Sequence, residues 1–293
     1  MKLITFEHDG SLGAGVLLGE ALVVCETGEA ARHAVRAIAE GDEARMQAWA
    51  CRAADDGARL RLSDVRLLAP IPEPRRDIFC VGKNYRAHAA EFHKSGFDSG
   101  GREEVPAHPV IFTKSLTAVI GPHASINAAL DPTDTTDYEG ELAVVIGRRA
   151  FGVKKAEAMD YVFGYVVFND VTARQLQRQH SQWVIGKGVD TYAPMGPALV
   201  TRDEVPDVAA LTLTTRVNGQ TRQSASLADL IFDIPTLIET MSATMTLLPG
   251  DIIATGTPAG VGIGFDPPRY LNNGDRVEVS ITGLGTLAND VRR

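Results

Sequence analysis

Cysteine is scarce in this chain, and its pattern excludes two kinds of structure. The three cysteines, Cys25, Cys51 and Cys80, are odd in number and far apart. They form neither a disulfide framework nor a Cys-x-x-Cys metal site. We interpret them as small buried apolar residues of a protein in a reducing compartment.

Long apolar runs and an excess of positive charge are also missing. No run approaches the ~18 apolar residues of a membrane-spanning helix. The opening MKLITFEHDG carries Glu7 and Asp9 where a secretory signal would be apolar. A net charge of −8 and a pI near 5.4 argue against nucleic acid or an anionic membrane as partner. These absences predict a soluble cytoplasmic protein.

What is present suits a globular protein of one or two domains, with 293 residues, 31.4 kDa and 44% hydrophobic residues. Over residues 1–24 apolar and turn residues alternate, which predicts two short strands around the turn DGSLG. Two short amphipathic helices should follow, separated by Gly41-Asp42. Three prolines in LLAPIPEPRRDI then indicate a linker. We therefore expect a small accessory module at 1–70 and a catalytic domain at 71–293.

The larger part is dominated by short β-type runs such as IFCVG, ELAVVIG, VFGYVVFND and RVEVSI. Helical patterns are limited to stretches near 86–92, 154–161 and 230–245. Because strands and helices do not alternate, a doubly wound parallel sheet is excluded, and we predict an α+β, mainly β fold with a few covering helices. The polar, glycine-rich segment 93–109 has the composition of a lid.

Two glutamates begin the apolar run TDYEGELAVVIG. Glu139 and Glu141 are separated by one residue, so in a strand both carboxylates point to one face. The alternative is a solvent-facing strand start. Asp170 ends another strand and could join them, although it could instead cap a helix. Three carboxylates without His or Cys are hard ligands that suit Mg²⁺, Mn²⁺ or Ca²⁺.

Other side chains could supply acid–base and anion-binding chemistry. His88 and Glu91 share one face of the helix in VGKNYRAHAAEF, as a general base and its orienting carboxylate would. The alternative is a surface ion pair. Lys187 lies between two glycines. It could sit close to a bound anion, and the alternative is a lysine in a surface turn. The loop TGTPAGVG at 255–262 could hold a carboxylate through its amides and Thr257.

Taken together and in order, these segments resemble the fumarylacetoacetate hydrolase family. The resemblance covers about residues 75–290, through the blocks GKNYRAHAAE, VIFTKS, DYEGELAVVIG, GYVVFNDVTARQLQ, IGKGVDTYAPMGP and GDIIATGTPAGVG. Six blocks in register make it specific. It implies a strongly rolled mixed β-sandwich, usually found as a homodimer.

The resemblance also implies roles for individual residues. Glu139, Glu141 and Asp170 match the metal-binding carboxylates, usually for Mg²⁺, and His88 with Glu91 matches a dyad that activates water. Lys114, Gln177, Lys187 and Thr257 match family positions around the 2-oxo acid end of the substrate. Arg174 matches the arginine of the family's TAR block. One departure is Gln175, which stands where the family usually has an acid, and this could loosen a contact behind the site.

Family members differ in the reaction that they catalyse. Because a water-activating dyad is present, we expect hydrolysis of a C–C bond in a 2,4-dioxo acid such as an acylpyruvate, through a metal-chelated 2-oxo acid and its enolate. Lys187 would add positive charge where the anion develops. The alternatives are isomerisation or decarboxylation of 5-carboxymethyl-2-hydroxymuconate-type compounds, and an oxaloacetate-type tautomerase or decarboxylase. A metal-dependent binding module without turnover is the non-enzymatic alternative.

Overall fold

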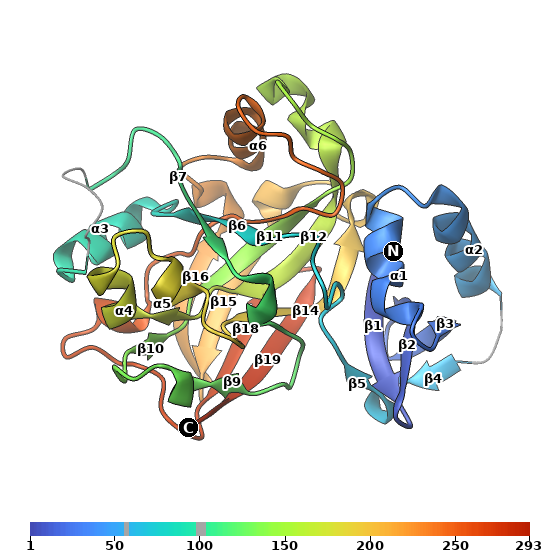
Figure 1. The fold of residues 1–293 in the computed structure, drawn as a ribbon, viewed down its shortest axis with the longest axis horizontal. Coiled ribbons are helices and arrows are strands. Elements are labelled where there is room, and N and C mark those ends of the chain that lie inside the picture. The colour runs from blue at the N-terminus through green and yellow to red at the C-terminus, as the bar shows by residue number, and fades with distance from the viewer. Residues whose placement is uncertain (56–58, 98–103) are drawn as a thin grey trace.

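The computed structural model describes residues 1–55, 59–97 and 104–293. Its largest element is a twelve-stranded sheet with the order β4-β3-β2-β1-β14-β12-β11-β17-β6-β7, to which β5 and β8 add at β1 and β14 (Figure 1). In chain order its strands are β1 (Lys2–His8), β2 (Ser11–Leu18), β3 (Ala21–Thr27), β4 (Arg59–Arg61), β5 (Arg66–Leu67), β6 (Ile78–Gly82), β7 (Val110–Lys114), β8 (Val119–Ile120), β11 (Gly140–Ile146), β12 (Val162–Asn169), β14 (Ala193–Thr201) and β17 (Ile252–Ala254).

A five-stranded sheet with the order β16-β15-β18-β19-β9 lies against one face of β11 and β12, and a two-stranded β10–β13 ladder stands beside it. These strands are β9 (Ile126–Asn127), β10 (Thr136–Asp137), β13 (Thr172–Ala173), β15 (Thr212–Val217), β16 (Gln220–Ser226), β18 (Arg276–Ile281) and β19 (Gly285–Arg292). The sheets thus form a sandwich with mixed strand directions. This confirms the predicted mainly β, α+β fold.

Strand β11 explains why its sequence is a continuous apolar run. Leu142, Val144 and Ile146 lie in the core shared with the five-stranded sheet. Ala143 and Val145 point to the other face, into the core shared with β6, β17 and the N-terminal helices. A strand that is covered on both faces has no solvent side to alternate with.

The helices are short and lie at the ends and one face of the sheets. They are α1 (Ala31–Ala39), α2 (Glu43–Ala54), α3 (Arg86–Lys94), α4 (Arg174–Gln179), α5 (Val184–Lys187) and α6 (Ile234–Ser242), with 3₁₀ turns η1 (Leu62–Asp64), η2 (Leu116–Ala118), η3 (Ala128–Leu130), η4 (Lys155–Tyr161), η5 (Arg202–Glu204), η6 (Val208–Ala210), η7 (Leu227–Asp229) and η8 (Gly262–Gly264). The helix expected at 230–245 is thus shorter, since it begins after the Asp233 cap, and the one at 154–161 is a 3₁₀ helix. Of the expected lid, residues 98–103 lie outside the described residues.

Three strands, β1 to β3, begin within residues 1–24, where we expected two, and the helices α1 and α2 follow on either side of Gly41-Asp42 as predicted. Strand β1 pairs antiparallel with β14, Lys2 opposite Val200, so the N-terminal strands extend the main sheet. Cys25 and Cys80 are buried, but Cys51 is exposed on α2, so the prediction that all three are buried was wrong for Cys51.

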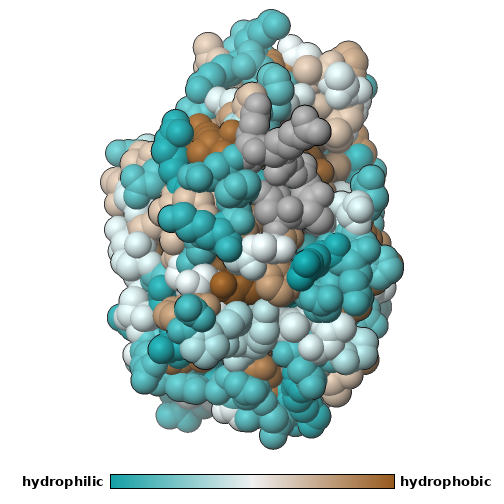
Figure 2. Space-filling model, turned by 90° about the vertical axis from the view of Figure 1, so that its left-hand side faces the viewer, coloured by the Kyte–Doolittle hydropathy of each residue, from teal (hydrophilic) through white to brown (hydrophobic). Residues whose placement is uncertain are grey.

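Helices α3, α4 and α5 gather at the end of the molecule opposite α1 and α2 (Figure 1). The face that carries α3 and α4 is mostly hydrophilic, with small separate apolar patches (Figure 2). Among the residues described, no helix is long and apolar enough to cross a membrane.

Candidate metal centre and active site

The three predicted carboxylates meet where β11 begins and β12 ends. Gly140 pairs with Asn169 in the antiparallel ladder, which places Glu139 and Glu141 beside Asp170. The Asp170 amide donates a hydrogen bond to the Glu139 carbonyl (2.8 Å), and the Asn169 side chain accepts one from the Glu139 amide (3.0 Å). One carboxylate oxygen from each acid lies within 4.8 Å of the others. Both alternatives, a solvent-facing strand start and an Asp170 helix cap, are wrong, because all three acids are buried and α4 begins only at Arg174.

Cationic side chains surround two of these acids. Lys187 Nζ lies 2.8 Å from both Glu139 Oε2 and Asp170 Oδ2. Arg174 Nη1 lies 2.6 Å from Glu139 Oε1, and Lys114 Nζ lies 2.7 Å from Asp170 Oδ1. Burial by itself disfavours the charge on Glu139, but Lys187 and Arg174 outweigh it and hold the pKa of Glu139 at about 2.

Glu141 has a different environment. Its carboxylate accepts the Gly256 amide at 2.9 Å. Burial, followed by the neighbouring charges of Asp170 and Glu139, raises the pKa of Glu141 well above its ordinary value near 4.5. The charges of these two neighbouring acids thus outweigh the opposing effects of Lys187 and the Gly256 amide on Glu141. Carboxylate oxygens that converge in this way fit a hard divalent cation, which would relieve the repulsion.

The second predicted pair lies on α3. His88 Nδ1 is 3.2 Å from Glu91 Oε2, and both side chains are largely buried, so the surface ion pair that we considered is wrong. The Gly260 amide donates to both Glu91 oxygens, at 3.0 and 3.2 Å. Gly264 also abuts Glu91, since a Cβ at this position would lie 1.8 Å from Glu91 Oε1. The loop after β17 therefore fixes the carboxylate, and the carboxylate fixes the imidazole.

His88 and one acid of the triad, Glu139, face one cavity. The cavity is lined by Val81, Gly82, Lys83, His88, Phe92, Phe112, Glu139, Arg174, Gln177, Trp183, Lys187 and Thr257. Its free volume is about 10 Å³, close to what one water molecule needs, so a substrate must move the surrounding side chains apart.

The residues expected around the substrate divide into two groups. Gln177, Lys187, Thr257 and Arg174 line the cavity, and Lys114 does not. Lys114 lies behind Asp170, where it also donates to the carbonyls of Val171 and Lys187. We expected Lys114 to lie beside the substrate, but in the structure it supports Asp170 instead.

Several contributing residues were missed in the sequence. Asp137 accepts Arg174 Nε at 2.9 Å and the amides of Gly262 and Ile263. Asp137 thus supplies a buried carboxylate to Arg174. Gln175, which stands where the family usually has an acid, is half-buried, and its backbone amide donates to the Thr135 hydroxyl. Gln223 on β16 links the Gly140 amide to the Thr257 hydroxyl. Asp137 lies within a matched block, but nothing in the pattern around Gln223 indicates a role.

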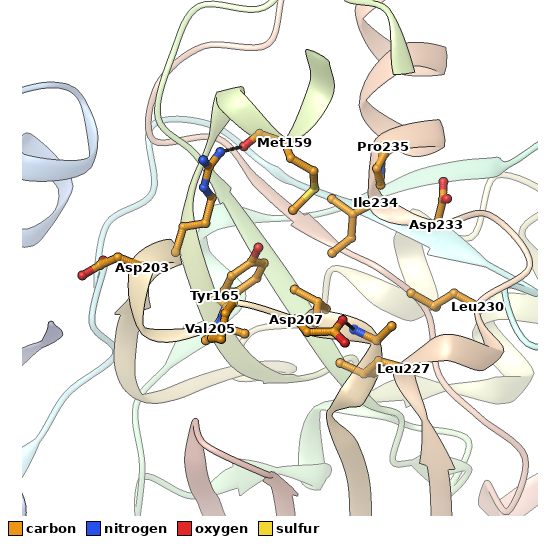
Figure 3. Close-up of a pocket in the computed structure, with 14 residues that line it drawn as sticks. Met159, Tyr165, Asp203, Val205, Asp207, Leu227, Leu230, Asp233, Ile234 and Pro235 are labelled. Atoms are coloured by element: carbon orange, nitrogen blue, oxygen red, sulfur yellow. Dashed lines mark hydrogen bonds between the residues drawn. The ribbon is translucent and has the colours of Figure 1, made fainter. Parts of the chain in front are cut away.

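A second cavity, of about 590 Å³, shares no lining residue with the first (Figure 3). Its walls include the apolar side chains of Met159, Leu227, Leu230 and Ile234, with the Tyr165 ring at one side. Within the described ranges, the triad is the one group of three or more His, Cys, Asp or Glu residues whose ligand atoms converge. The chemistry therefore belongs to the cavity beside the triad.

With the fold and this site in view, comparison with known proteins defines the class. Residues 77–292 match the sequence model of the fumarylacetoacetate (FAA) hydrolase C-terminal domain. The chain belongs to this family, as the six sequence blocks predicted, and the family comprises enzymes. The predicted rolled sandwich is confirmed by solved structures of the same fold that align over the whole chain.

Individual relatives within the family carry different names. Oxaloacetate tautomerase YisK from Bacillus subtilis is 48% identical over 264 residues, 88% of this chain and 85% of that protein. The structure of 5-carboxymethyl-2-hydroxymuconate delta-isomerase from Mycobacterium smegmatis has a TM-score of 0.76 at 37% identity and covers 100% of both chains. That of maleylpyruvate hydrolase from Sphingobium sp. SYK-6, in complex with manganese(II) ion and pyruvate, has a TM-score of 0.78 at 32% identity and covers 100% of this chain and 99% of that one.

Proposed function

We propose that this protein is a divalent-metal-dependent enzyme that interconverts the keto and enol forms of a 2-oxo acid. The observation that carries the proposal is that one cavity is lined both by Glu139, a member of a buried carboxylate triad, and by the His88 imidazole, which is held by its own carboxylate. The first provides a site for a cation, and the second provides a group that can move a proton.

Glu139, Glu141 and Asp170 would hold the cation, with Mg²⁺ as the first candidate and Mn²⁺ or Ca²⁺ as alternatives. A cation held there would supply Lewis acidity toward a bound 2-oxo acid and make the protons on the carbon next to its keto group more acidic. The manganese(II) and pyruvate of the maleylpyruvate hydrolase structure support this choice of ion and substrate class.

His88 would carry the proton. Its Nδ1 is engaged by Glu91, which leaves Nε2 to take a proton from the carbon next to the keto group and return it to the oxygen. Lys187 and Arg174 line the same cavity and would stabilise negative charge as it develops on the substrate. Gln177 and Thr257 would orient the acid.

The order of candidate reactions follows from the relatives. The tautomerase relative is 48% identical across most of the chain, which supports ranking proton transfer ahead of the C–C hydrolysis that the sequence led us to expect. Hydrolysis of an acylpyruvate is the second candidate, because the same His88–Glu91 pair could activate water. The maleylpyruvate hydrolase structure, which shares this fold, supports hydrolysis as the second candidate reaction.

A substrate panel separates the two reactions. Oxaloacetate, pyruvate and a set of 2,4-dioxo acids would be incubated with Mg²⁺-loaded protein, and proton exchange at the carbon next to the keto group and C–C cleavage would both be followed by NMR. We expect fast exchange with oxaloacetate and little cleavage of any compound. Cleavage that is faster than exchange would move the assignment to a hydrolase.

We propose further that residues 1–70 are an accessory module, since the described residues assigned to the site begin at Val81. The homodimer implied by the family resemblance stays a prediction. Light scattering should give twice the chain mass of 31.4 kDa, and a stable monomer would contradict it.

A further inference from the structure

Two buried hydrogen-bond donors at the cavity beside the triad lack acceptors. Arg174 Nη2 and Trp183 Nε1 meet no acceptor within the part of the chain that the structure describes. Arg174 is 0% exposed and Trp183 6%, and both residues line the cavity. A buried donor without a partner carries a desolvation cost, so such donors mark places where a ligand can bind.

Two residues on the walls of this cavity have an uncommon backbone conformation. Lys83 has φ +55° and Trp183 has φ +52°, in the left-handed region that side chains with a Cβ rarely adopt. Such conformations persist only where the surrounding structure imposes them, and they gather at functional sites.

The neighbours of Lys83 and Trp183 hold both residues in the left-handed conformation. The Trp183 ring meets Phe92 and Phe112 edge to face, and a Cβ on Gly82 would lie 2.7 Å from its Cζ3. Next to Lys83, the Asn84 side chain is hydrogen-bonded to both backbone groups of Phe232 and to the Thr255 carbonyl. Both side chains are therefore positioned at the cavity by rigid neighbours.

The charges along the cavity favour an anion. The described lining residues include three cationic side chains, Lys83, Arg174 and Lys187, and one carboxylate, Glu139. That carboxylate is already engaged by Arg174 and Lys187, and it belongs to the proposed metal site. A cation at the triad would increase the positive charge further.

We infer that Lys83, Trp183 and Arg174 Nη2 form a subsite for the second carboxylate of a short dicarboxylic 2-oxo acid. This inference rests on the proposed function, in which the first carboxylate and the keto oxygen lie at the triad. Arg174 also contacts Glu139 of the triad through Nη1, at 2.6 Å, so the subsite lies close to the metal site and suits a short acid. A monocarboxylic acid such as pyruvate would leave Arg174 Nη2 and Trp183 Nε1 unpaired and would be disfavoured.

The chain contains only two tryptophans, which provides a matched control. Trp183→Phe keeps the ring contacts and removes the N–H group. Trp49→Phe makes the same change at a buried position on α2, outside the site. Lys83→Asn removes the charge while keeping a residue type that tolerates the left-handed conformation. Circular dichroism and thermal unfolding would confirm that each variant folds.

Affinities for oxaloacetate and pyruvate would be measured by calorimetry on Mg²⁺-loaded protein. We expect the wild type and Trp49→Phe to bind oxaloacetate at least about tenfold more tightly than pyruvate, and Trp183→Phe and Lys83→Asn to lose about tenfold for oxaloacetate alone. In Trp49→Phe, oxaloacetate should shift the emission of the remaining Trp183 more than pyruvate does.

Equal wild-type affinity for the two acids would overturn the inference, as would an equal loss for both acids in the two subsite variants. Failure of the proposed function has a different signature. A dicarboxylate preference without tautomerisation would retain the subsite and reject the function, whereas tautomerisation without the preference would reject the subsite.

Discussion

The ammonium group of Lys187 lies 2.8 Å from a carboxylate oxygen of Asp170, and at the same distance from Glu139. It therefore neutralises two of the three acids of the proposed metal site from within the protein. Burial alone would lower the pKa of Lys187, but Asp170 and Glu139 outweigh it and raise this pKa above its ordinary value. Glu141 receives no comparable partner, and this difference leads to the first two predictions.

Glu141→Gln should stabilise the metal-free protein and abolish its response to metal. A raised carboxyl pKa in the folded state means that stability is present below the ordinary value and is lost as pH rises through the raised pKa. At pH 8 and without metal, the variant should therefore be more stable to unfolding than the wild type. Mg²⁺ should raise the Tm of the wild type but not of the variant. Glu157→Gln on exposed η4 is the control, and equal Mg²⁺ shifts in all three proteins would contradict the assignment.

Metal binding should release a proton from Glu141. The raised pKa means that this carboxyl group must lose a proton to become a ligand, so metal affinity should increase with pH up to that pKa, by up to about tenfold per pH unit. Calorimetry in two buffers of different ionisation enthalpy measures the number of protons released. Glu141→Gln should show no release; binding without buffer dependence in the wild type would be the contrary result.

His88→Asn should remove turnover while metal affinity stays near the wild-type value. A positioned acid–base group contributes on the order of 10²–10⁴-fold, and we expect a loss in this range for proton exchange in oxaloacetate. Glu91→Gln should cost less, because Glu91 acts by orienting the imidazole. The control is His123→Asn at an exposed left-handed position that Asn tolerates. Wild-type exchange rates in His88→Asn would exclude His88 from the mechanism.

Gly264→Ala tests whether the position of Glu91 matters. The added Cβ would lie 1.8 Å from Glu91 Oε1, so the carboxylate must leave its present position against His88. We expect kcat to fall about tenfold or more, with metal affinity unchanged and a stability loss of about 1–3 kcal/mol from overpacking. If kcat is unchanged although a structure of the variant shows Glu91 displaced, orientation by Glu91 is not needed.

Only part of the proposed metal site has a local sequence signal. The period of a strand puts Glu139 and Glu141 on one face, whereas Asp170, which directly follows the neighbouring strand, was joined to them through the family resemblance. A local signal also joins His88 and Glu91, which are three residues apart on a helix. Strands and helices with strong apolar patterns were placed well for the same reason.

The remaining contacts depend on tertiary structure. Asp137 reaches Arg174 across the β10–β13 ladder, and Gln223 reaches Thr257 from a strand of the second sheet. Neither contact has a local sequence signal. Lys114 shows the opposite error: it lies in a matched block, yet the fold places its ammonium behind Asp170 and away from the cavity. Matching blocks indicate which residues gather, whereas packing decides which of them face the cavity.

The most direct test is the rate at which enol-oxaloacetate is converted to the keto form, followed by stopped-flow absorbance. We predict that wild-type protein with Mg²⁺ accelerates the conversion well beyond Mg²⁺ alone, that EDTA abolishes the effect and Mn²⁺ restores it, and that the double variant Glu139→Gln, Glu141→Gln stays at the background rate. Full acceleration by protein that elemental analysis shows to be metal-free, or no acceleration by the metal-loaded wild type, would contradict the account.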